Sequence, residues 1–248
     1  MSILFVAADA AELKPFAERL EGLRKLSWPI AYAYEGIAEG RRVILAANGA
    51  GPKLAAKATE VAIRAVTGAE LSSSRLEAVV STGYAGGLDP GLRLGDLVIA
   101  SQVLDFATGE HFPCGDVEGE AARGVVLSQD RIANDAREKQ QLYVRTAASA
   151  VEMESSGVAA RAKRAGLPFY CIKVISDTAT ESFALDLNNM RTEQGKVSRG
   201  KIMIYALGRP MLVPGLLRLK RRTENAAQAL GEFLVSCRIC SDIHSAGE

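Results

Sequence analysis

Short, almost continuously apolar runs alternate along this chain with stretches whose apolar residues recur at helical spacing. Strands that are covered on both faces have this composition, because neither face needs polar side chains. The alternation predicts an α/β fold, in which helices cover a mainly buried sheet. The predicted strands are residues 3–8, 42–48, 76–82, 94–101, 124–128, 147–153 and 169–176.

Helical spacing and turn residues complete the predicted order of elements. Pro52 suits the first position of a helix, where its missing N–H is not needed. The turn signal Asp89-Pro90-Gly91 links two predicted strands with little room for a helix between them. The sheet is therefore predicted to be mixed. The predicted helices are residues 11–20, a segment beginning at Pro52, and residues 132–143, 155–165 and 225–235.

Length and composition favour one globular domain. The chain has 248 residues, of which 48% are hydrophobic and 24% charged, so it can form a single large core. We expect that domain to span residues 1–236, with residues 237–248 as a C-terminal tail. The net charge is +1, from 30 basic and 29 acidic residues, so no overall field favours nucleic acid as a partner.

The N-terminus predicts a strand rather than an export signal. The apolar run that begins at Met1 stops at Asp9 and has no basic leader. No apolar stretch of the sequence is long enough to span a bilayer. We therefore expect a cytoplasmic protein whose four cysteines are reduced.

Cys237, Cys240 and His244 raise the question of a metal site. A closed zinc site needs four ligands, and the sequence has no second Cys-x-x-Cys or His pair. We therefore expect neither a metal nor a cofactor. With two histidines in the chain, a His-based catalytic triad is not favoured either.

Glycines are concentrated after the third predicted strand, in residues 82–87. Glycine lets a ligand approach the backbone closely and leaves N–H groups free to point at oxygen atoms. The spacing differs from the dinucleotide-binding fingerprint, and no helix follows directly. A tight turn between two strands is the alternative reading of this segment.

Four carboxylates stand where predicted strands end: Glu12, Glu152, Glu154 and Asp177. A buried carboxylate is unfavourable unless it is paired, hydrogen-bonded or used in chemistry. Residues two apart in a strand share a face, so Glu152 and Glu154 could enter one cleft. Carboxylates at successive strand ends would suit a general acid and a sugar-binding group.

Each carboxylate also has an ordinary structural reading. Glu12 and Glu154 could complement the N-terminal dipole of the helix that follows them. Asp177 and its neighbour Ser176 could be N-cap or turn residues after their strand. The sequence leaves both readings open.

Residues 209–222 interleave leucines with five basic residues. Such a segment could pack its leucines on the core as an ordinary surface element. It could instead contact a membrane surface or an amphiphilic ligand. The composition is compatible with both.

Several of these segments, in this order, resemble the nucleoside phosphorylase/nucleosidase superfamily, and most closely the 5'-methylthioadenosine/S-adenosylhomocysteine nucleosidases. The resemblance runs from about residue 1 to about residue 180. It implies a three-layer α/β/α sandwich around a mixed sheet, with the site at the carboxyl ends of the strands. Residues 82–88 with Gly95-Asp96 match the family's TGSAGGL…GD segment, Val151-Glu152-Met153-Glu154 its VEME segment, Ile175-Ser176-Asp177 its ISD segment, and Glu12 its water-activating glutamate.

The resemblance also implies roles for individual residues. Asp177 would protonate or hydrogen-bond purine N7, held by Ser176, and as an acid it needs surroundings that favour its protonated form. Glu154 would bind the ribose hydroxyls. Glu12 would activate the attacking water. The other residues expected to contact substrate are Gly83, Tyr84, Ala85, Gly86, Ile132, Glu152 and Met153, the last of which would pack on the sugar.

Departures from the family pattern bear on the substrate. Ile132 stands where relatives often stack an aromatic residue on the purine, and Tyr84, at a usually small position, would narrow the site. From about residue 181 the chain resembles the hopanoid-biosynthesis-associated branch, which is linked to removing adenine from adenosylhopane, a lipid nucleoside. A tail rich in leucine and arginine would suit a lipid substrate, or a position beside the inner membrane.

The nucleophile is predicted to be water. Superfamily phosphorylases carry a Gly/Arg pair after the first strand and an arginine before the glycine segment, where this chain has residues 8–12 and Ser81. Glu12 would repel a phosphate dianion. The predicted function is therefore hydrolytic release of adenine from a 5'-substituted adenosine such as methylthioadenosine or S-adenosylhomocysteine.

Three alternatives stay open. The first is removal of adenine from adenosylhopane. The second is phosphorolysis, because the hopanoid-associated branch is usually described as phosphorylases. The third is a binding protein that has lost catalysis. The resemblance further implies a homodimer in which a neighbouring subunit closes the 5' end of the pocket.

Overall fold

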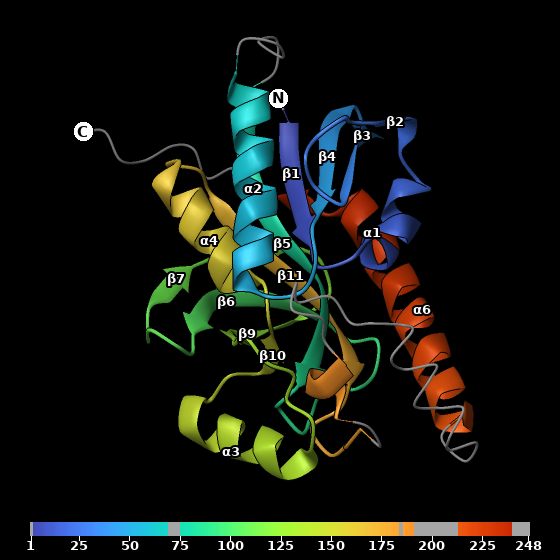
Figure 1. Cartoon of the computed structure of the whole chain (residues 1–248), viewed down its shortest axis with the longest axis vertical. Helices are drawn as coiled ribbons and strands as arrows, with labels where there is room; N and C mark the ends of the chain where they lie inside the picture. Colours follow the sequence, from blue (N-terminus) through green and yellow to red (C-terminus); the bar gives the residue numbers. More distant parts are fainter. Residues whose placement is uncertain (1, 69–74, 184–185, 191–212, 240–248) are drawn as a thin grey trace.

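A ten-stranded sheet runs through the molecule (Figure 1), whose computed structural model describes residues 2–68, 75–183, 186–190 and 213–239. Its strands follow the order β10-β9-β6-β11-β5-β1-β4-β3-β2, and β7 pairs with β6. The strands are β1 (Ser2–Ala7), β2 (Glu21–Lys25), β3 (Tyr32–Ala38), β4 (Arg41–Ala47), β5 (Leu76–Gly87), β6 (Leu97–Asp105), β7 (His111–Pro113), β9 (Ala122–Ser128), β10 (Ala150–Glu152) and β11 (Phe169–Asp177).

The sheet is mixed, as predicted. Strands β1, β4, β5 and β11 run parallel to their neighbours within this group, whereas β6 is antiparallel to β11 and β3 is antiparallel to β4. Strand β10 also pairs with the glycine end of β5, where Ala150 and Val151 face Gly87 and Gly86. The carboxyl ends of β1, β5 and β11 therefore lie at the same edge of the sheet.

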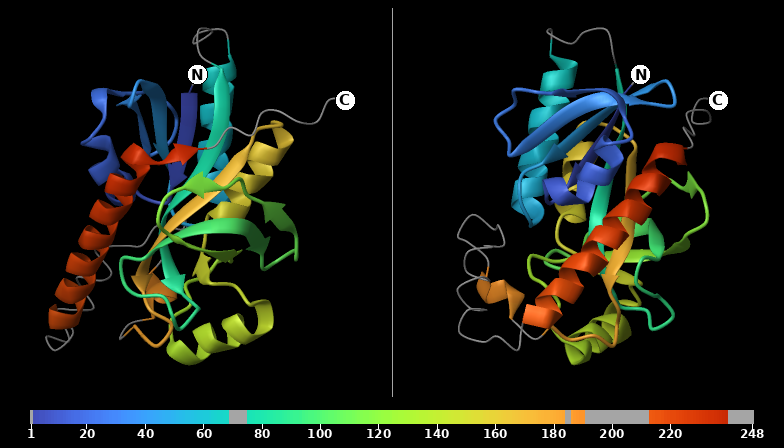
Figure 2. Two further views of the ribbon diagram at one scale, coloured as in Figure 1. Left: turned by 180° about the vertical axis from the view of Figure 1, so that it is seen from behind. Right: turned by 90° about the vertical axis from the view of Figure 1, so that its right-hand side faces the viewer.

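Helices cover both faces of the sheet and give the predicted three layers (Figures 1 and 2). On one face, α2 (Pro52–Thr67) and α4 (Ser155–Arg164) pack together; on the other, α1 (Ala10–Ala17) packs against α6 (Val213–Ser236). The helix α3 (Ala136–Thr146) lies beyond β10, and a short 3-10 helix, η2, spans Leu187–Met190. The predicted α/β/α sandwich is confirmed.

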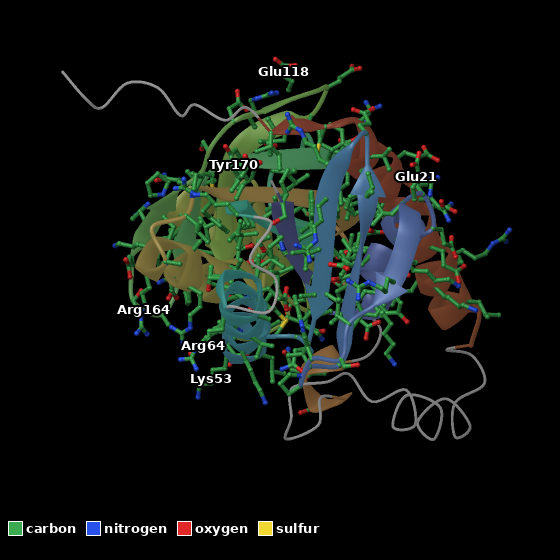
Figure 3. The ribbon with its side chains drawn as sticks, turned by 90° about the horizontal axis from the view of Figure 1, so that it is seen from above. Glu21, Lys53, Arg64, Glu118, Arg164 and Tyr170 are labelled. Atoms are coloured by element: carbon green, nitrogen blue, oxygen red, sulfur yellow. The ribbon has the colours of Figure 1, made fainter. Side chains whose placement is uncertain are left out.

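Two apolar cores explain the continuously apolar strands. Leu4 of β1 packs in the core beneath α2 and α4, while its neighbour Phe5 packs in the core beneath α1 and α6. Phe5 meets Phe16 of α1 edge to face, with ring centroids 5.0 Å apart. Figure 3 shows that the charged side chains of Lys53, Arg64 and Arg164 project outward from α2 and α4. The Tyr170 side chain, by contrast, lies in the interior.

Several boundaries differ from the prediction: α3, for example, spans Ala136–Thr146 where residues 132–143 were expected, and β6 spans Leu97–Asp105 where residues 94–101 were expected. Strand β5 continues through Gly87, so residues 82–87 form a strand end, and Asp89 makes the turn by accepting the N–H of Gly91 at 2.8 Å. Helix α6 begins at Val213 rather than at residue 225, and most of the described side chains in its first half are exposed. The hairpin of β2 and β3 was not predicted.

The predicted tail begins inside ordered structure. Strand β12 (Arg238–Ile239) pairs with β8 (Val117–Glu118), and the Ile239 side chain is buried. Packing of the domain thus continues beyond residue 236, where we expected it to end. Across the described segments, no helix has both the length and the apolar character needed to cross a bilayer.

The end of β11 contains one extra residue relative to its partner strand. Ile175 lies opposite Ala85 and Asp177 opposite Gly86, so the pairing shifts between them and Ser176 has no counterpart on β5. Bulges of this kind redirect side chains and are common beside functional sites. Here the bulge leads directly to a predicted site residue, Asp177.

Candidate active site

Four segments bring the predicted site residues together at one edge of the sheet. Glu12 follows β1 and lies against Gly83 of β5, while Asp177 ends β11 and lies against Gly86. Glu154 begins α4 and reaches across to Gly51, at the start of α2. The carboxylates of Glu12 and Asp177 therefore lie against the glycine end of β5. Glu154 lies near enough to Glu12 for the Glu12 charge to act on it.

Glu12 is positioned by the first turn of α1. Its Oε2 accepts the backbone N–H groups of Ala8 at 2.9 Å and Asp9 at 3.3 Å, and Asp9 caps the helix in return. The ordinary reading of Glu12 as a first-turn acid is thus correct, and it fixes the side chain. Burial raises the pKa of Glu12 to about 7, against a smaller opposite effect of Lys173.

Gly83 is required by close approach. Its φ of +121° is unfavourable for other residues, and a Cβ at this position would lie 2.6 Å from Oε2 of Glu12. Gly86 is similar, since a Cβ there would lie 2.9 Å from Oδ2 of Asp177. The glycines of β5 allow two carboxylates to approach the same stretch of backbone.

Glu154 is directed away from its own helix. Its Oε1 accepts the N–H of Gly51 at 2.9 Å, and its side chain makes no capping bond to α4, so the dipole-capping alternative does not describe it. Burial, with a further contribution from the Glu152 charge, raises the pKa of Glu154 to about 8. Near neutral pH this group is mostly protonated and can donate as well as accept.

Glu152 forms a buried ion pair with Lys173 of β11, at 2.9 Å. It also accepts the N–H groups of Glu154 and Ser155, while Lys173 contacts Ser81 Oγ and the Thr82 carbonyl. Burial acts to raise the pKa of Glu152, but the Lys173 charge and the hydrogen bonds from Lys173, the Glu154 N–H and Ser128 together make the net shift downward. Glu152 is therefore paired with Lys173 and also lies close enough to Glu154 for its charge to act on that carboxyl.

Asp177 has a partner that sequence analysis missed. Its Oδ1 accepts the Ser176 hydroxyl at 2.7 Å, and its Oδ2 accepts Nζ of Lys139 from α3 at 2.5 Å. Sequence spacing could have indicated this partner, because Lys139 lies three residues before Leu142 and so on the same face of the helix. In the structure these two are the buried residues of α3.

The other residues expected to contact substrate include Ile132, Met153, Ala85 and Tyr84. Ile132 is held by Asn188, whose side chain accepts its N–H at 2.8 Å and donates to its carbonyl at 3.0 Å. Met153 and Ala85 are buried. Tyr84 is half-buried, and its hydroxyl donates to the Thr223 carbonyl of α6 at 2.9 Å, so the ring reaches towards α6. Substrate contacts by these residues stay predictions.

The possible metal ligands singled out in the sequence, Cys237, Cys240 and His244, lie near the C-terminus. In the described ranges, no group of three or more His, Cys, Asp or Glu side chains could hold an ion. Cys237 is a free thiol there, whereas Cys240 and His244 lie outside the described residues.

The model of the phosphorylase superfamily matches residues 2–119 and 113–201. The chain belongs to that superfamily. This confirms the predicted family and the expectation of an enzyme of the nucleosidase or phosphorylase class.

Curated relatives are named 5'-methylthioadenosine/S-adenosylhomocysteine nucleosidases. The one from Halalkalibacterium halodurans is 28% identical over 204 residues, which cover 71% of this chain and 84% of the relative. The one from Geobacillus kaustophilus is 27% identical over 212 residues, covering 73% and 86%.

Solved structures share the fold. The nucleosidase of Neisseria meningitidis, in complex with methylthio-immucillin-A, has a TM-score of 0.69 at 22% identity and covers 94% of this chain and 96% of its own. The futalosine hydrolase of Helicobacter pylori has a TM-score of 0.67 at 21% identity, covering 94% and 95%. Both agree with the three-layer sandwich.

Proposed function

We propose that this protein hydrolyses the N-glycosidic bond of a 5'-substituted adenosine, such as methylthioadenosine or S-adenosylhomocysteine, and releases adenine. The observation that carries the proposal is the approach of Glu12 and Asp177 to the glycine end of β5, with Glu154 within electrostatic reach of Glu12. The names of the curated relatives support it.

The chemistry requires a cation-stabilising site. When the bond between N9 and C1' breaks, the purine keeps the electron pair and the sugar becomes oxocarbenium-like. Carboxylates around C1' stabilise that charge. In this proposal Ile132 and Met153 supply the apolar walls against the base and the sugar.

Glu12 is the proposed base. With a pKa of about 7, it is substantially ionised at neutral pH and can take a proton from water as the oxygen attacks C1'. Glu154, protonated at that pH, can donate to one ribose hydroxyl oxygen while it accepts the N–H of Gly51. Asp177 binds the departing purine at N7.

The charge of the site favours water over phosphate. A phosphate dianion placed beside C1' would meet the ionised Glu12, and its binding normally calls for arginines or free backbone N–H groups. The N–H groups of Ala8 and Asp9, which follow β1, are instead bonded to Glu12.

Adenine release from methylthioadenosine, measured by chromatography with and without phosphate, tests the proposal. We expect release without phosphate, and a loss of about 100-fold or more in Glu12→Gln. Release that depends on phosphate and yields a 1-phosphorylated sugar would overturn hydrolysis. No release under either condition would overturn activity on methylthioadenosine and favour a bulkier nucleoside, of the adenosylhopane type, or a binding protein.

A second candidate substrate is an amphiphilic nucleoside of the adenosylhopane type. The N-terminal end of α6 projects beyond the sheet (Figures 1 and 2) and exposes Leu217, at 57%, together with four basic residues. Leucine with lysine and arginine on one exposed helix suits an anionic membrane surface. The basic residues are Arg218, Lys220, Arg221 and Arg222; residues 209–212 of the predicted segment lie outside the described residues.

Reversing the charge of two arginines on α6 tests whether this helix binds a membrane surface independently of nucleoside cleavage. The variant Arg218→Glu/Arg221→Glu should lose binding to anionic vesicles in co-sedimentation while retaining cleavage of methylthioadenosine. Lys53→Glu/Lys57→Glu on α2, equally exposed, is the matched control and should bind like the unmodified protein. Equal vesicle binding by all three proteins would remove the case for a membrane-surface role.

The homodimer and the cytoplasmic location, with or without a position beside the inner membrane, remain predictions drawn from the resemblance and the sequence. Sedimentation velocity tests the first and cell fractionation the second.

A further inference from the structure

Helix α4 begins without a cap from its own N-cap residue. Glu154 occupies the N-cap position, but its side chain makes no bond to the first turn and instead accepts the N–H of Gly51. The first N–H groups of a helix have no acceptor within the helix, so other groups must accept them when the helix end is buried. At α4 these acceptors come from a neighbouring strand and from the residue two positions before Glu154.

Glu152 and Ser128 supply the missing acceptors. Glu152 Oε2 accepts the N–H of Glu154 and the N–H of Ser155, each at 3.0 Å. Ser128, the last residue of β9, accepts the N–H of Ser156 at 3.1 Å, and its hydroxyl is also a hydrogen-bond partner of Glu152. All these residues are buried. The Glu154 carboxyl is therefore not needed at the end of its own helix.

Lys173 makes a buried carboxylate cap possible. A carboxylate away from water needs a counter-charge, and the ammonium of Lys173 lies 2.9 Å from Glu152. The same ammonium donates to Ser81 Oγ at 3.2 Å and to the Thr82 carbonyl at 3.1 Å, just before the glycine of β5 that faces Glu12. The start of α4 is thus tied to the stretch of β5 against which the proposed base lies.

Glu152 has no room for a substrate contact of its own. Its Oε2 accepts the Lys173 ammonium as well as the Glu154 N–H, and its Oε1 accepts the Ser155 N–H at 3.1 Å. Its side chain is 1% exposed. The substrate contact that we expected for Glu152 therefore does not fit its surroundings.

We infer that Glu152 is a positioning residue, which caps α4 in place of Glu154 and thereby holds the Glu154 carboxyl towards the sugar of the substrate. The inference rests on the proposed function, in which Glu154 binds a ribose hydroxyl, and deepens it by giving Glu152 a role without substrate contact.

The test compares methylthioadenosine with its 2',3'-dideoxy analogue, which lacks the hydroxyls that Glu154 would bind. The ratio of kcat/KM for the first over the second should be high in the unmodified enzyme and should largely collapse in Glu154→Ala. In Glu152→Gln one acceptor oxygen becomes an N–H donor and Lys173 loses its counter-charge, so the start of α4 should shift. We expect the ratio to fall about 10-fold or more.

A purely structural role predicts another pattern. Glu35→Gln also removes a buried carboxylate from its ion pairs, with Arg24 and Arg42, but it lies on β3 outside the site and serves as the matched control. It should leave the ratio unchanged. If Glu152→Gln keeps the ratio as Glu35→Gln does, the inference is wrong.

A double variant distinguishes positioning from direct contact. If Glu152 acts through Glu154, then Glu152→Gln/Glu154→Ala should show the same ratio as Glu154→Ala alone, because the group being positioned is already gone. A further fall in the double variant would show that Glu152 contacts the ribose itself and would overturn the inference.

Two further outcomes are separable. If Glu152→Gln does not fold, Ser128→Ala removes one acceptor of the α4 cap without leaving a charge unpaired, and it should lower the ratio about 3-fold; an unchanged ratio would overturn the inference. If the unmodified enzyme releases adenine from neither nucleoside, the proposed function fails and this role fails with it. Cleavage with an unaltered ratio in the Glu152 and Ser128 variants rejects the role of Glu152 alone.

Discussion

Gly83 faces Glu12 so closely that a Cβ on Gly83 would lie 2.6 Å from the Glu12 Oε2. Gly83→Ala should therefore displace the proposed base and lower kcat about 100-fold, since small misplacements of reacting groups have effects of that size. Gly95→Ala is the matched control, because Gly95 also has a positive φ, +85°, but has no atom within 4 Å of its Cβ position. Equal losses in both variants would attribute the effect to backbone strain.

The pH dependence of catalysis should follow Glu12. Only its ionised form accepts a proton, so kcat/KM should rise about tenfold per pH unit at acid pH and level off above about 7, the raised pKa of Glu12. Steady-state assays from pH 5 to about 9 would measure this profile. The residual activity of Glu12→Gln should lack that ionisation; an unchanged profile would assign it to another group.

Ionisation of the buried Glu154 carboxyl should lower the free energy of unfolding at alkaline pH. Its pKa is raised from 4.5 to about 8 by burial, so the folded state holds this proton more tightly than the unfolded chain. The contribution of this group to the free energy of unfolding is fully present below pH 4.5 and is lost as the pH rises through about 8. Glu154→Gln, which cannot ionise, should be more stable than the unmodified protein at pH ~9, by on the order of 2 kcal/mol.

Urea unfolding at pH ~5 and ~9 measures this difference, which should largely vanish at the lower pH. Glu232→Gln, at an exposed position of α6, is the control and should change stability at neither pH. A Glu154→Gln protein that is destabilised equally at both pH values would contradict the prediction.

The pair of Glu152 and Lys173 should show strong energetic coupling. Lys173→Met leaves a buried carboxylate without its ammonium and should lower the free energy of unfolding by about 3–5 kcal/mol. The double variant Lys173→Met/Glu152→Gln should recover much of that loss. Denaturant unfolding of the single and double variants gives the coupling energy, and simple additivity would show that the pair is not coupled.

The central strands could be predicted because their surroundings leave a mark on the sequence. Leu4 and Phe5 face different cores, so β1 is apolar from Ile3 to Ala7, and β5 and β11 are likewise buried on both faces along most of their length. Strand β2, by contrast, is exposed throughout and is ordered by pairing with β3 at the sheet edge. Because none of its side chains is buried, the sequence of β2 has no apolar pattern from which the strand could be predicted.

The site was predictable only in part for a similar reason. Glu12, Glu154 and Asp177 stand at strand ends, which spacing can identify. The partners Lys139 and Lys173 come from a helix and a strand interior, and their pairing is created by tertiary packing. Lys173 nevertheless left a signal, because a lysine within the buried run of β11 must find an opposite charge.

The extra residue at Ser176 makes the site depend on residue count as well as residue identity. Asp177 reaches Gly86 because β11 carries one residue more than β5 over the same pairing distance. Deletion of Ser176 would move Asp177 by one position and turn its side chain to the opposite face of the sheet. We therefore expect β11 to tolerate some substitutions. Insertions and deletions should be tolerated only in the loops that precede and follow the strand.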